Sequence, residues 1–221
     1  MANLIKQLLK LICKLIIFGL LFILIQIPTL GEAFLPGETP TKFNFLLHIG
    51  ITLFSTIIIL WFVTIFYHSL NHKPIFSKTN LVKNYSFAAC LAMLSQVLQS
   101  YIALISKTND NDTELFMISK SRLAPILMVT LIFISPLLEE LLWQGALQGG
   151  ILKSFNPFFT ILITGLLFAL AHGYSFSYDT LQLFCSGLAY AITYYHTGDW
   201  GTAIFCHGLS NFIVYSINFI F

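Results

Sequence analysis

Seven stretches of the chain are apolar over lengths that suit membrane-spanning α-helices, and this pattern constrains the fold more than any other feature. The hydrocarbon core of a bilayer is about 30 Å thick, so a spanning helix needs roughly 20 residues at about 1.5 Å of rise each. Only 9% of the residues are charged, against roughly a quarter in a soluble domain. The sequence therefore predicts an all-α, polytopic transmembrane helical bundle of about seven spans, with the lipid bilayer as a partner. The predicted spans are 11–30, 44–67, 84–106, 123–150, 157–173, 179–197 and 201–220.

Lysine and arginine positions predict the orientation, because cytoplasmic loops are enriched in these residues. If the N-terminus is cytoplasmic, Lys6, Lys10, Lys14, Lys73, Lys78, Lys83 and Lys153 lie inside, and Lys42, Lys107, Lys120 and Arg122 lie outside. We therefore expect a multi-pass protein of the cell membrane with a cytoplasmic N-terminus. The formal net charge is +2 and the basic residues form no stripe, which argues against nucleic acid as a partner.

Two adjacent carboxylates, Glu139 and Glu140, lie inside the fourth apolar stretch. Ionisable groups at membrane depth are costly and usually functional. On a helix the two side chains point about 100° apart, so only one is expected to face a given point in a site. The other would orient a ligand, pair with a neighbour or accept a hydrogen bond from Gln144. A purely structural pair, neutralised by protonation or by polar contacts with another helix, is the alternative.

Two polar groupings downstream have the spacing of one helical turn. They are Phe168-x-x-x-His172 and His207-x-x-x-Asn211, and each places both side chains on one helix face. Either histidine alone is more often structural than catalytic, but their estimated depths allow both to share a layer with the carboxylates. Trp143 lies beside the carboxylates in sequence and either walls the site or packs between helices.

A carboxylate pair, two histidines and an asparagine are the groups needed to activate water and stabilise an oxyanion. A glutamate would accept a proton from water that His172 helps to hold, while His207 and Asn211 would donate hydrogen bonds to the tetrahedral intermediate. A variant places a divalent metal such as zinc on Glu139, His172 and His207, where it would activate bound water. The H-E-x-x-H spacing typical of zinc is absent, and the residues leave both variants open.

The three motifs together resemble the signature E-E-x-x-x-R, F-x-x-x-H and H-x-x-x-N of the CPBP family, the CAAX-protease and bacteriocin-processing (Abi) intramembrane proteases. The resemblance covers about residues 123–215. It divides the chain into N-terminal transmembrane helices with a polar loop, residues 1–122, and a CPBP-like catalytic helical core, residues 123–221. It implies an all-helical membrane fold, a cavity open toward the cytoplasm, and hydrolysis of a peptide bond within or beside the bilayer.

Carried over by position, the resemblance implies that Glu139 is the principal water-activating carboxylate and His172 its partner. His207 and Asn211 would be the oxyanion or ligand pair. Gln144 stands where the family usually has arginine, and a neutral amide supplies neither the charge nor the donors of a guanidinium. Recognition of a substrate carboxyl group is therefore expected to differ, or the adjoining carboxylate to protonate more readily. The residues predicted to bind substrate are Gln144, Trp143 and Phe168, with Glu140 completing the catalytic set.

These features predict an intramembrane endopeptidase, a hydrolase whose partner is a membrane-associated peptide or protein. Ten lysines to one arginine, with abundant Ile, Phe and Asn, resemble the bias of an AT-rich bacterial genome and favour peptide maturation, signalling or bacteriocin immunity in a bacterium. One alternative is a non-catalytic membrane partner that binds a peptide, which the glutamine at position 144 favours. Another is a proton- or ion-coupled transporter, against which the lack of an internal repeat counts.

Overall fold

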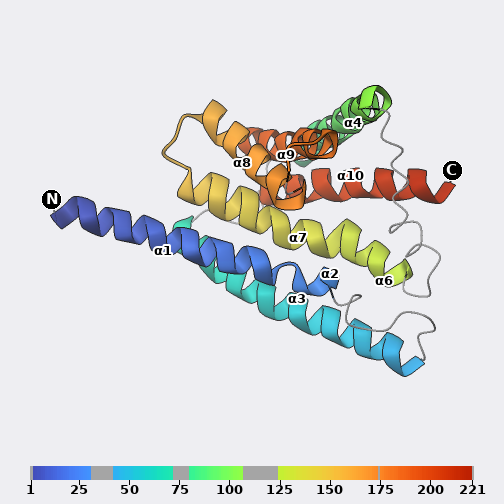
Figure 1. Ribbon diagram of the computed structural model, residues 1–221, viewed down its shortest axis with the longest axis horizontal. Helices are drawn as coiled ribbons and strands as arrows, with labels where there is room; N and C mark the ends of the chain where they lie inside the picture. The colour runs from blue at the N-terminus through green and yellow to red at the C-terminus, as the bar shows by residue number, and fades with distance from the viewer. Residues whose placement is uncertain (1, 31–41, 72–79, 107–123, 174, 221) are drawn as a thin grey trace.

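All regular elements in the described part of the chain are helices, which confirms the all-α prediction. The computed structural model describes residues 2–30, 42–71, 80–106, 124–173 and 175–220 (Figure 1). The predicted polar loop at 107–122 lies outside these residues. Five of the basic residues that bear on orientation lie outside as well: Lys73, Lys78, Lys107, Lys120 and Arg122. The cytoplasmic N-terminus therefore stays a prediction.

The helices follow the predicted spans closely. They are α1 (Ala2–Leu24), α2 (Ile27–Leu30), α3 (Lys42–Leu70), α4 (Leu81–Ser106), α6 (Ala124–Val129), η2 (Thr130–Ile134), α7 (Ser135–Glu140), η3 (Leu141–Ile151), α8 (Pro157–Gly173), α9 (Tyr178–Thr197) and α10 (Trp200–Ile220). The run α6–η2–α7–η3 forms one continuous helix, Ala124–Ile151, called the central helix below. Among the described residues, α1, α3, α4 and the central helix are long and apolar enough to cross a membrane, and α8 is a shorter apolar helix. The bundle is that of a multi-pass membrane protein.

The first helix differs from its predicted bounds of 11–30. It begins at Ala2 and ends at Leu24, and the short α2 follows after a turn. The prediction from apolar residues alone placed the start of this helix too late, because it left out the segment that contains the first two lysines. Those lysines are four residues apart, so they lie along one helix face, and their long side chains can carry the charge out of apolar surroundings. Pro28 falls in α2, where its missing N–H costs nothing in the first turn of a helix.

The central helix lies between two groups of helices (Figure 1). On one side α1 and α3 pack against η3, and on the other α10 packs against η2 and α7, while α4 and α8 both pack on α9. The N-terminal helices thus share a core with the C-terminal ones. Phe18 and Phe22 of α1, for example, meet the indole of Trp143 edge-on. The predicted boundary between residues 122 and 123 lies outside the described residues.

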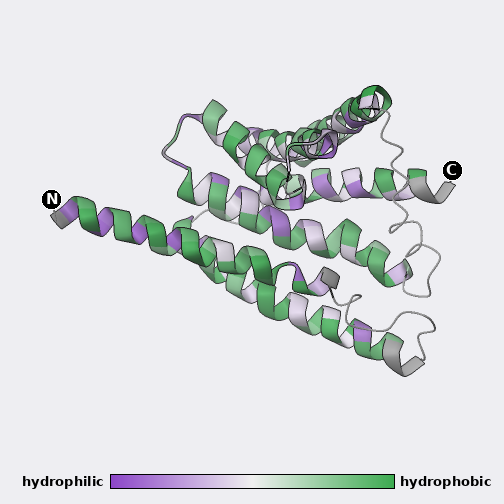
Figure 2. Ribbon diagram, in the orientation of Figure 1, coloured by the Kyte–Doolittle hydropathy of each residue, from purple (hydrophilic) through white to green (hydrophobic). Residues whose placement is uncertain are grey.

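Apolar side chains cover both the core and much of the outer surface. Leu138, Leu141 and Leu142 of the central helix are fully buried against α3, whereas Phe54 and Trp61 of α3 are exposed. Figure 2 shows the hydrophobic colour continuing around the outside of the helices. Such a surface suits lipid rather than water, because hydrocarbon imposes no cost on exposed apolar groups.

The central helix is irregular on both sides of the two glutamates. Thr130–Ile134 and Leu141–Ile151 are π-helical, and Pro136, in the first turn of α7, supplies no N–H for the carbonyl one turn before it. Such π-helical turns are frequent at functional sites. The local sequence thus breaks the regular α-helical ladder where the carboxylates lie.

Helix α10 packs closely against the irregular η2 segment. A Cβ atom on Gly208 would lie 2.6 Å from the carbonyl oxygen of Ile132, so a glycine is needed for this approach. Three residues later, Nδ2 of Asn211 donates to the carbonyl of Leu131 at 2.8 Å. These two contacts fix the depth of α10 and with it the position of His207.

Candidate active site

Glu139 lies near the end of α7 and has one oxygen paired within its own helix. Ser135, one turn earlier, donates a short hydrogen bond from Oγ to Oε1 of Glu139. The other oxygen, Oε2, lies 3.4 Å from Nε2 of His172 and is buried without a hydrogen-bond partner. One carboxylate oxygen is therefore fixed and the second is left to interact with a proton donor.

His172 lies in the last turn of α8 and is oriented by its own helix. Its Nδ1 lies 2.8 Å from the carbonyl oxygen of Phe168, which can only accept, so Nδ1 carries a proton. Nε2 then faces Glu139 either with a lone pair or, in the charged ring, with a second proton. Two lone pairs would repel each other, so the Glu139–His172 contact requires a shared proton or a bridging donor such as water.

Glu140 is fully buried and turns toward a different helix. Its Oε1 lies 2.8 Å from Nδ1 of His207 on α10, and its Oε2 has no hydrogen-bond partner. The divergence of adjacent helical side chains thus distributes the two glutamates between the two histidines, as the spacing permitted. Each carboxylate has one paired oxygen and one buried, unpaired oxygen.

Aromatic rings hold the two histidines in place. Phe168 lies against both, with ring centroids 4.4 Å from His172 and 5.7 Å from His207. Tyr190 of α9 stacks almost parallel on His207, at 4.3 Å and 14°. Because these rings are tightly packed, neither imidazole can rotate without disturbing the core.

The three residues predicted to bind substrate are all buried in this structure. Trp143 packs edge-on against Phe168 with ring centroids 6.0 Å apart. Gln144 lies within interaction range of the Glu140 carboxylate, although its amide makes no hydrogen bond of normal geometry. All three, Phe168 included, lie in the protein interior, and their contact with substrate stays a prediction.

Asn211 makes its hydrogen bond to the backbone of the central helix rather than to a member of the carboxylate–histidine pairs. The bond from Nδ2 to Leu131 uses one of the two protons of its amide group. The structure therefore gives Asn211 a positioning role for α10, and its predicted role at the oxyanion stays a prediction.

The side chain of His172 is the most accessible of the four paired residues. It is 30% exposed, while Glu139 is 8% exposed and Glu140 is fully buried. The Glu139–His172 pair is thus the more exposed of the two pairs, and the Glu140–His207 pair is the more buried.

The predicted metal ligands Glu139, His172 and His207 do not form one compact group. In the part of the chain that the structure describes, no three His, Cys, Asp or Glu side chains are arranged to hold a metal ion. Nδ1 of His207 contacts Glu140, which leaves Nε2 of the same ring without an assigned partner. The metal variant stays a prediction, and no step below passes through a metal.

Comparison with known protein families identifies the C-terminal part of the chain. Residues 121–213 match the Rce1-like family, described as type II CAAX prenyl endopeptidase Rce1-like. The Rce1-like family is the CPBP family, so the match agrees with the resemblance of the three motifs over this part of the chain. The match takes in 93 of the 221 residues and contains every candidate site residue named above.

The match supports a CAAX-type intramembrane protease kind of function, because the Rce1-like family is a family of proteases. No curated protein and no solved structure gave a match to the chain. The CPBP match leaves the catalytic residues and the substrate of this chain open.

Three residues that contact or position members of the candidate active site were not predicted from the sequence. Ser135 lies four residues before Glu139, and that spacing is the signal for its hydrogen bond to the carboxylate. Gly208 follows His207 directly, and a glycine inside an apolar helix is the signal that could have indicated its close approach to Ile132. Tyr190 gave no comparable signal, because its stacking on His207 depends on how α9 and α10 pack.

Proposed function

We propose that this protein is an intramembrane endopeptidase that hydrolyses a peptide bond in a membrane-associated peptide or protein. The observation that carries the proposal is that each buried glutamate faces a different histidine and keeps one buried oxygen, Oε2, without a hydrogen-bond partner. Buried polar atoms without partners are costly, and at a cluster of titratable groups they mark candidate catalytic sites. Its role in peptide maturation, signalling or bacteriocin immunity in a bacterium is part of the proposal.

Glu139 is the proposed general base. Its unpaired Oε2 and Nε2 of His172 are 3.4 Å apart, and a water molecule beside both could donate one proton to the carboxylate and another to the ring. As the water oxygen attacks the carbonyl carbon, its proton passes to Glu139. A positioned general base of this kind contributes about 10²–10⁴-fold to a rate.

His207 is the proposed electrostatic stabiliser of the tetrahedral intermediate. Because Glu140 contacts Nδ1, the ring can hold a second proton at Nε2 and donate it as a hydrogen bond to the oxyanion. A fixed donor aimed at developing charge in a site shielded from water costs no reorganisation during the reaction. Tyr190 and Phe168 pack against the imidazole of His207 and fix its orientation, which keeps Nε2 directed at the oxyanion.

Collapse of the intermediate completes hydrolysis. The proton taken by Glu139 passes to the nitrogen of the leaving group, directly or through His172. The C–N bond then breaks and gives a carboxylic acid and an amine that carries the transferred proton. The acid then loses the remaining water proton to the amine, so that the products leave as a carboxylate and an ammonium group. Glu139 thus acts first as base and then as acid.

A non-catalytic peptide-binding or immunity partner is the alternative. The neutral Gln144, fully buried beside Glu140, favours it, because no guanidinium is present at that position to hold a substrate carboxyl group. Such a protein would keep the polar cluster as a binding site and cleave nothing.

Cleavage of membrane-inserted peptides separates these two functions. Purified protein is reconstituted in liposomes with a mixture of hydrophobic peptides, and products are read by mass spectrometry. We expect cleavage by the unaltered protein and losses of at least about 100-fold in Glu139→Gln and His172→Gln. His196→Gln is the matched control, because His196 is exposed and packs on Phe87 and Tyr195 away from the carboxylates.

A chelator arm tests the metal variant in the same assay. Activity that survives chelation supports the carboxylate–histidine mechanism, whereas activity that is lost and restored by zinc would replace it with metal-activated water. If correctly folded protein cuts no peptide but still binds some of them through Glu139 and His172, the non-catalytic alternative is correct.

A further inference from the structure

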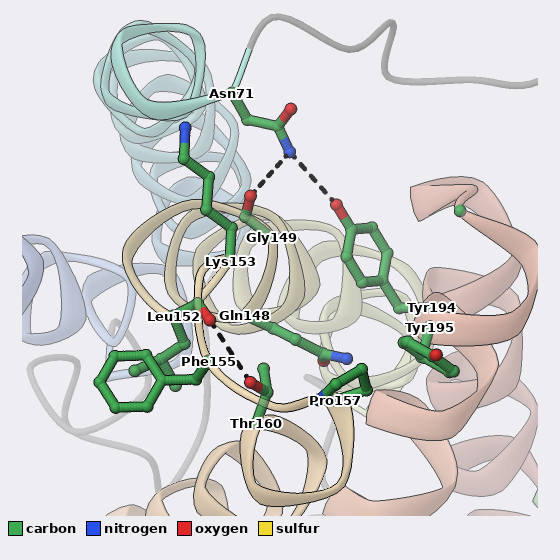
Figure 3. A pocket seen from close by; sticks show the side chains of 11 residues that line it. Asn71, Gln148, Gly149, Leu152, Lys153, Phe155, Pro157, Thr160, Tyr194 and Tyr195 are labelled. Carbon is green, nitrogen blue, oxygen red and sulfur yellow. Dashed lines mark hydrogen bonds between the residues drawn. The ribbon is translucent and has the colours of Figure 1, made fainter.

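A polar pocket of about 230 Å³ lies at one end of the bundle, away from the carboxylates. It forms where α3, η3 and α9 end and where α8 begins (Figure 3). Gln148 in its wall lies eight residues beyond Glu140 on the central helix, about 12 Å at 1.5 Å per residue. The pocket therefore lies near a membrane surface rather than in the catalytic layer. Its lining residues are Asn71, Gln148, Gly149, Leu152, Lys153, Phe155, Pro157, Thr160, Tyr194, Tyr195 and Gly198.

The side-chain oxygen of Gln148 is a buried hydrogen-bond acceptor without a donor. Its side chain is only 4% exposed, and Nε2 donates to the carbonyl of Ala191 at 3.0 Å. Oε1 has no hydrogen-bond partner, while Figure 3 shows the amide end reaching toward Pro157 at the pocket. Because a buried amide oxygen is normally satisfied, the pocket is matched to a ligand that brings an N–H or O–H donor.

Lys153 gives the pocket its charge. Its ammonium group donates to the carbonyl of Leu70 at 3.3 Å, which uses one of its three protons. Among the described residues that line the pocket, Lys153 is the only charged one. The lining therefore favours an anion over a cation.

The pocket wall is held in a fixed shape. Asn71 donates from Nδ2 to the carbonyl of Gly149 at 3.3 Å and to the hydroxyl of Tyr194 at 3.4 Å, so that it joins α3, η3 and α9 (Figure 3). A Cβ atom on Gly149 would collide with the Tyr194 hydroxyl. A preformed pocket loses little entropy when it binds.

The rim of the pocket is apolar. Phe155 lines the pocket and is 58% exposed, and Leu152 and Pro157 line it as well. A cationic pocket near a membrane surface, with an exposed aromatic side chain at its rim, matches the two parts of a lipid.

We propose that this pocket binds the headgroup of an anionic glycerophospholipid, with its phosphate at Lys153, a headgroup hydroxyl donating to Oε1 of Gln148, and its acyl chains over the exposed ring of Phe155. Phosphatidylglycerol has all three features. The site does not depend on the proposed peptidase activity, because none of its residues belongs to the carboxylate–histidine pairs.

Binding is tested on the detergent-purified full chain by native mass spectrometry with three lipids of equal chain length. Phosphatidylglycerol carries both charge and hydroxyls, phosphatidylmethanol carries the charge alone, and phosphatidylcholine has no net charge. We expect phosphatidylglycerol to bind about tenfold more tightly than phosphatidylmethanol, the effect of one hydrogen bond to a buried acceptor. Phosphatidylcholine should bind more weakly still. Equal binding of all three lipids would overturn the proposal.

Variants locate the binding. Lys153→Gln should lower the affinity for phosphatidylglycerol about tenfold, and Gln148→Met should abolish its preference over phosphatidylmethanol. Lys83→Gln, which removes an exposed lysine near the start of α4, is the matched control and should bind as the unaltered protein does. An equal loss in Lys83→Gln would show non-specific attraction and contradict the site. Lys153→Gln alone is decisive if Gln148→Met fails to fold.

Two competitors distinguish the source of the anion. If glycerol phosphate displaces the lipid at equal concentration, the ligand is a soluble phosphate and the lipid proposal is wrong. If a short peptide displaces it only when its C-terminal carboxylate is free, the pocket is a peptide site and the proposal is again wrong. Failure of both to compete is the result we expect.

Discussion

Nδ1 of His207 lies 2.8 Å from Oε1 of Glu140, and this buried pair joins α10 to the central helix inside the bundle. Both side chains are buried, at 6% and 0% exposure, so bulk water does not reach them to replace a lost partner. The pair therefore contributes to the fold as well as to the proposed chemistry, and the two contributions can be measured separately.

Removing one member of this pair should destabilise the protein strongly. Glu140→Met or His207→Phe leaves a buried polar group alone, at a cost of about 3–5 kcal/mol. The double variant replaces the pair with apolar groups, so its loss should be clearly smaller than the sum of the single losses. Unfolding in mixed micelles measures all four proteins, and additive losses would show that the two side chains do not interact.

Gly208→Ala should lower the free energy of unfolding by about 1–3 kcal/mol, because the new Cβ would lie 2.6 Å from the backbone oxygen of Ile132. The matched control is Gly50→Ala in α3, where no neighbour lies within 4 Å. That change should be neutral or stabilising by up to about 1 kcal/mol. Equal effects of the two substitutions would rule out a close approach of α10.

Asn211→Ala should cost about 1 kcal/mol of stability, the usual effect of one lost hydrogen bond, because the side chain donates to Leu131. If Asn211 also stabilises the oxyanion, kcat should fall by about 10²–10³-fold with KM little changed. A stability loss with a much smaller change in kcat would assign it a positioning role only. Unfolding and peptide cleavage on the same preparation distinguish these outcomes.

Phe168→Leu should reduce stability by about 1–2 kcal/mol, because it removes ring contacts with both His172 and His207. We also expect kcat to fall as the imidazoles gain freedom. Phe158→Leu is the control, since Phe158 is largely exposed on α8. Unchanged activity in Phe168→Leu would mean that the ring does not position the histidines.

The sequence was sufficient to predict the bundle and its approximate spans, whereas the roles of the predicted site residues stay predictions. Apolar length predicts spans directly, and the polar residues at four-residue spacing could be assigned to helix faces. The partner of each glutamate could not be predicted without the structure. Adjacent residues on a helix point about 100° apart, so the sequence indicates that Glu139 and Glu140 face different neighbours but not which histidine each one faces.

The π-helical segments and the pocket at Gln148 were not predicted. Pro136 is a local signal for an irregular helix. The extent of the π-helical turn before it depends on the helix that packs there, and in this structure Gly208 and Asn211 of α10 contact that segment. Gln144 and Gln148, one turn apart in an apolar helix, were a visible signal for a second polar face. Their roles depend on α9 and α3, whose contacts the spacing cannot show.

Incorporation of oxygen from isotopically labelled water is the most direct test of the central claim that Glu139 activates water for peptide hydrolysis. Liposomes carrying the protein and membrane-inserted peptides are incubated in ¹⁸O-water, and the products are weighed by mass spectrometry. We predict one ¹⁸O atom in each newly formed carboxylate, with product absent from correctly folded Glu139→Gln protein. Labelled product at an unchanged rate in Glu139→Gln, or cleavage without ¹⁸O, would contradict the mechanism.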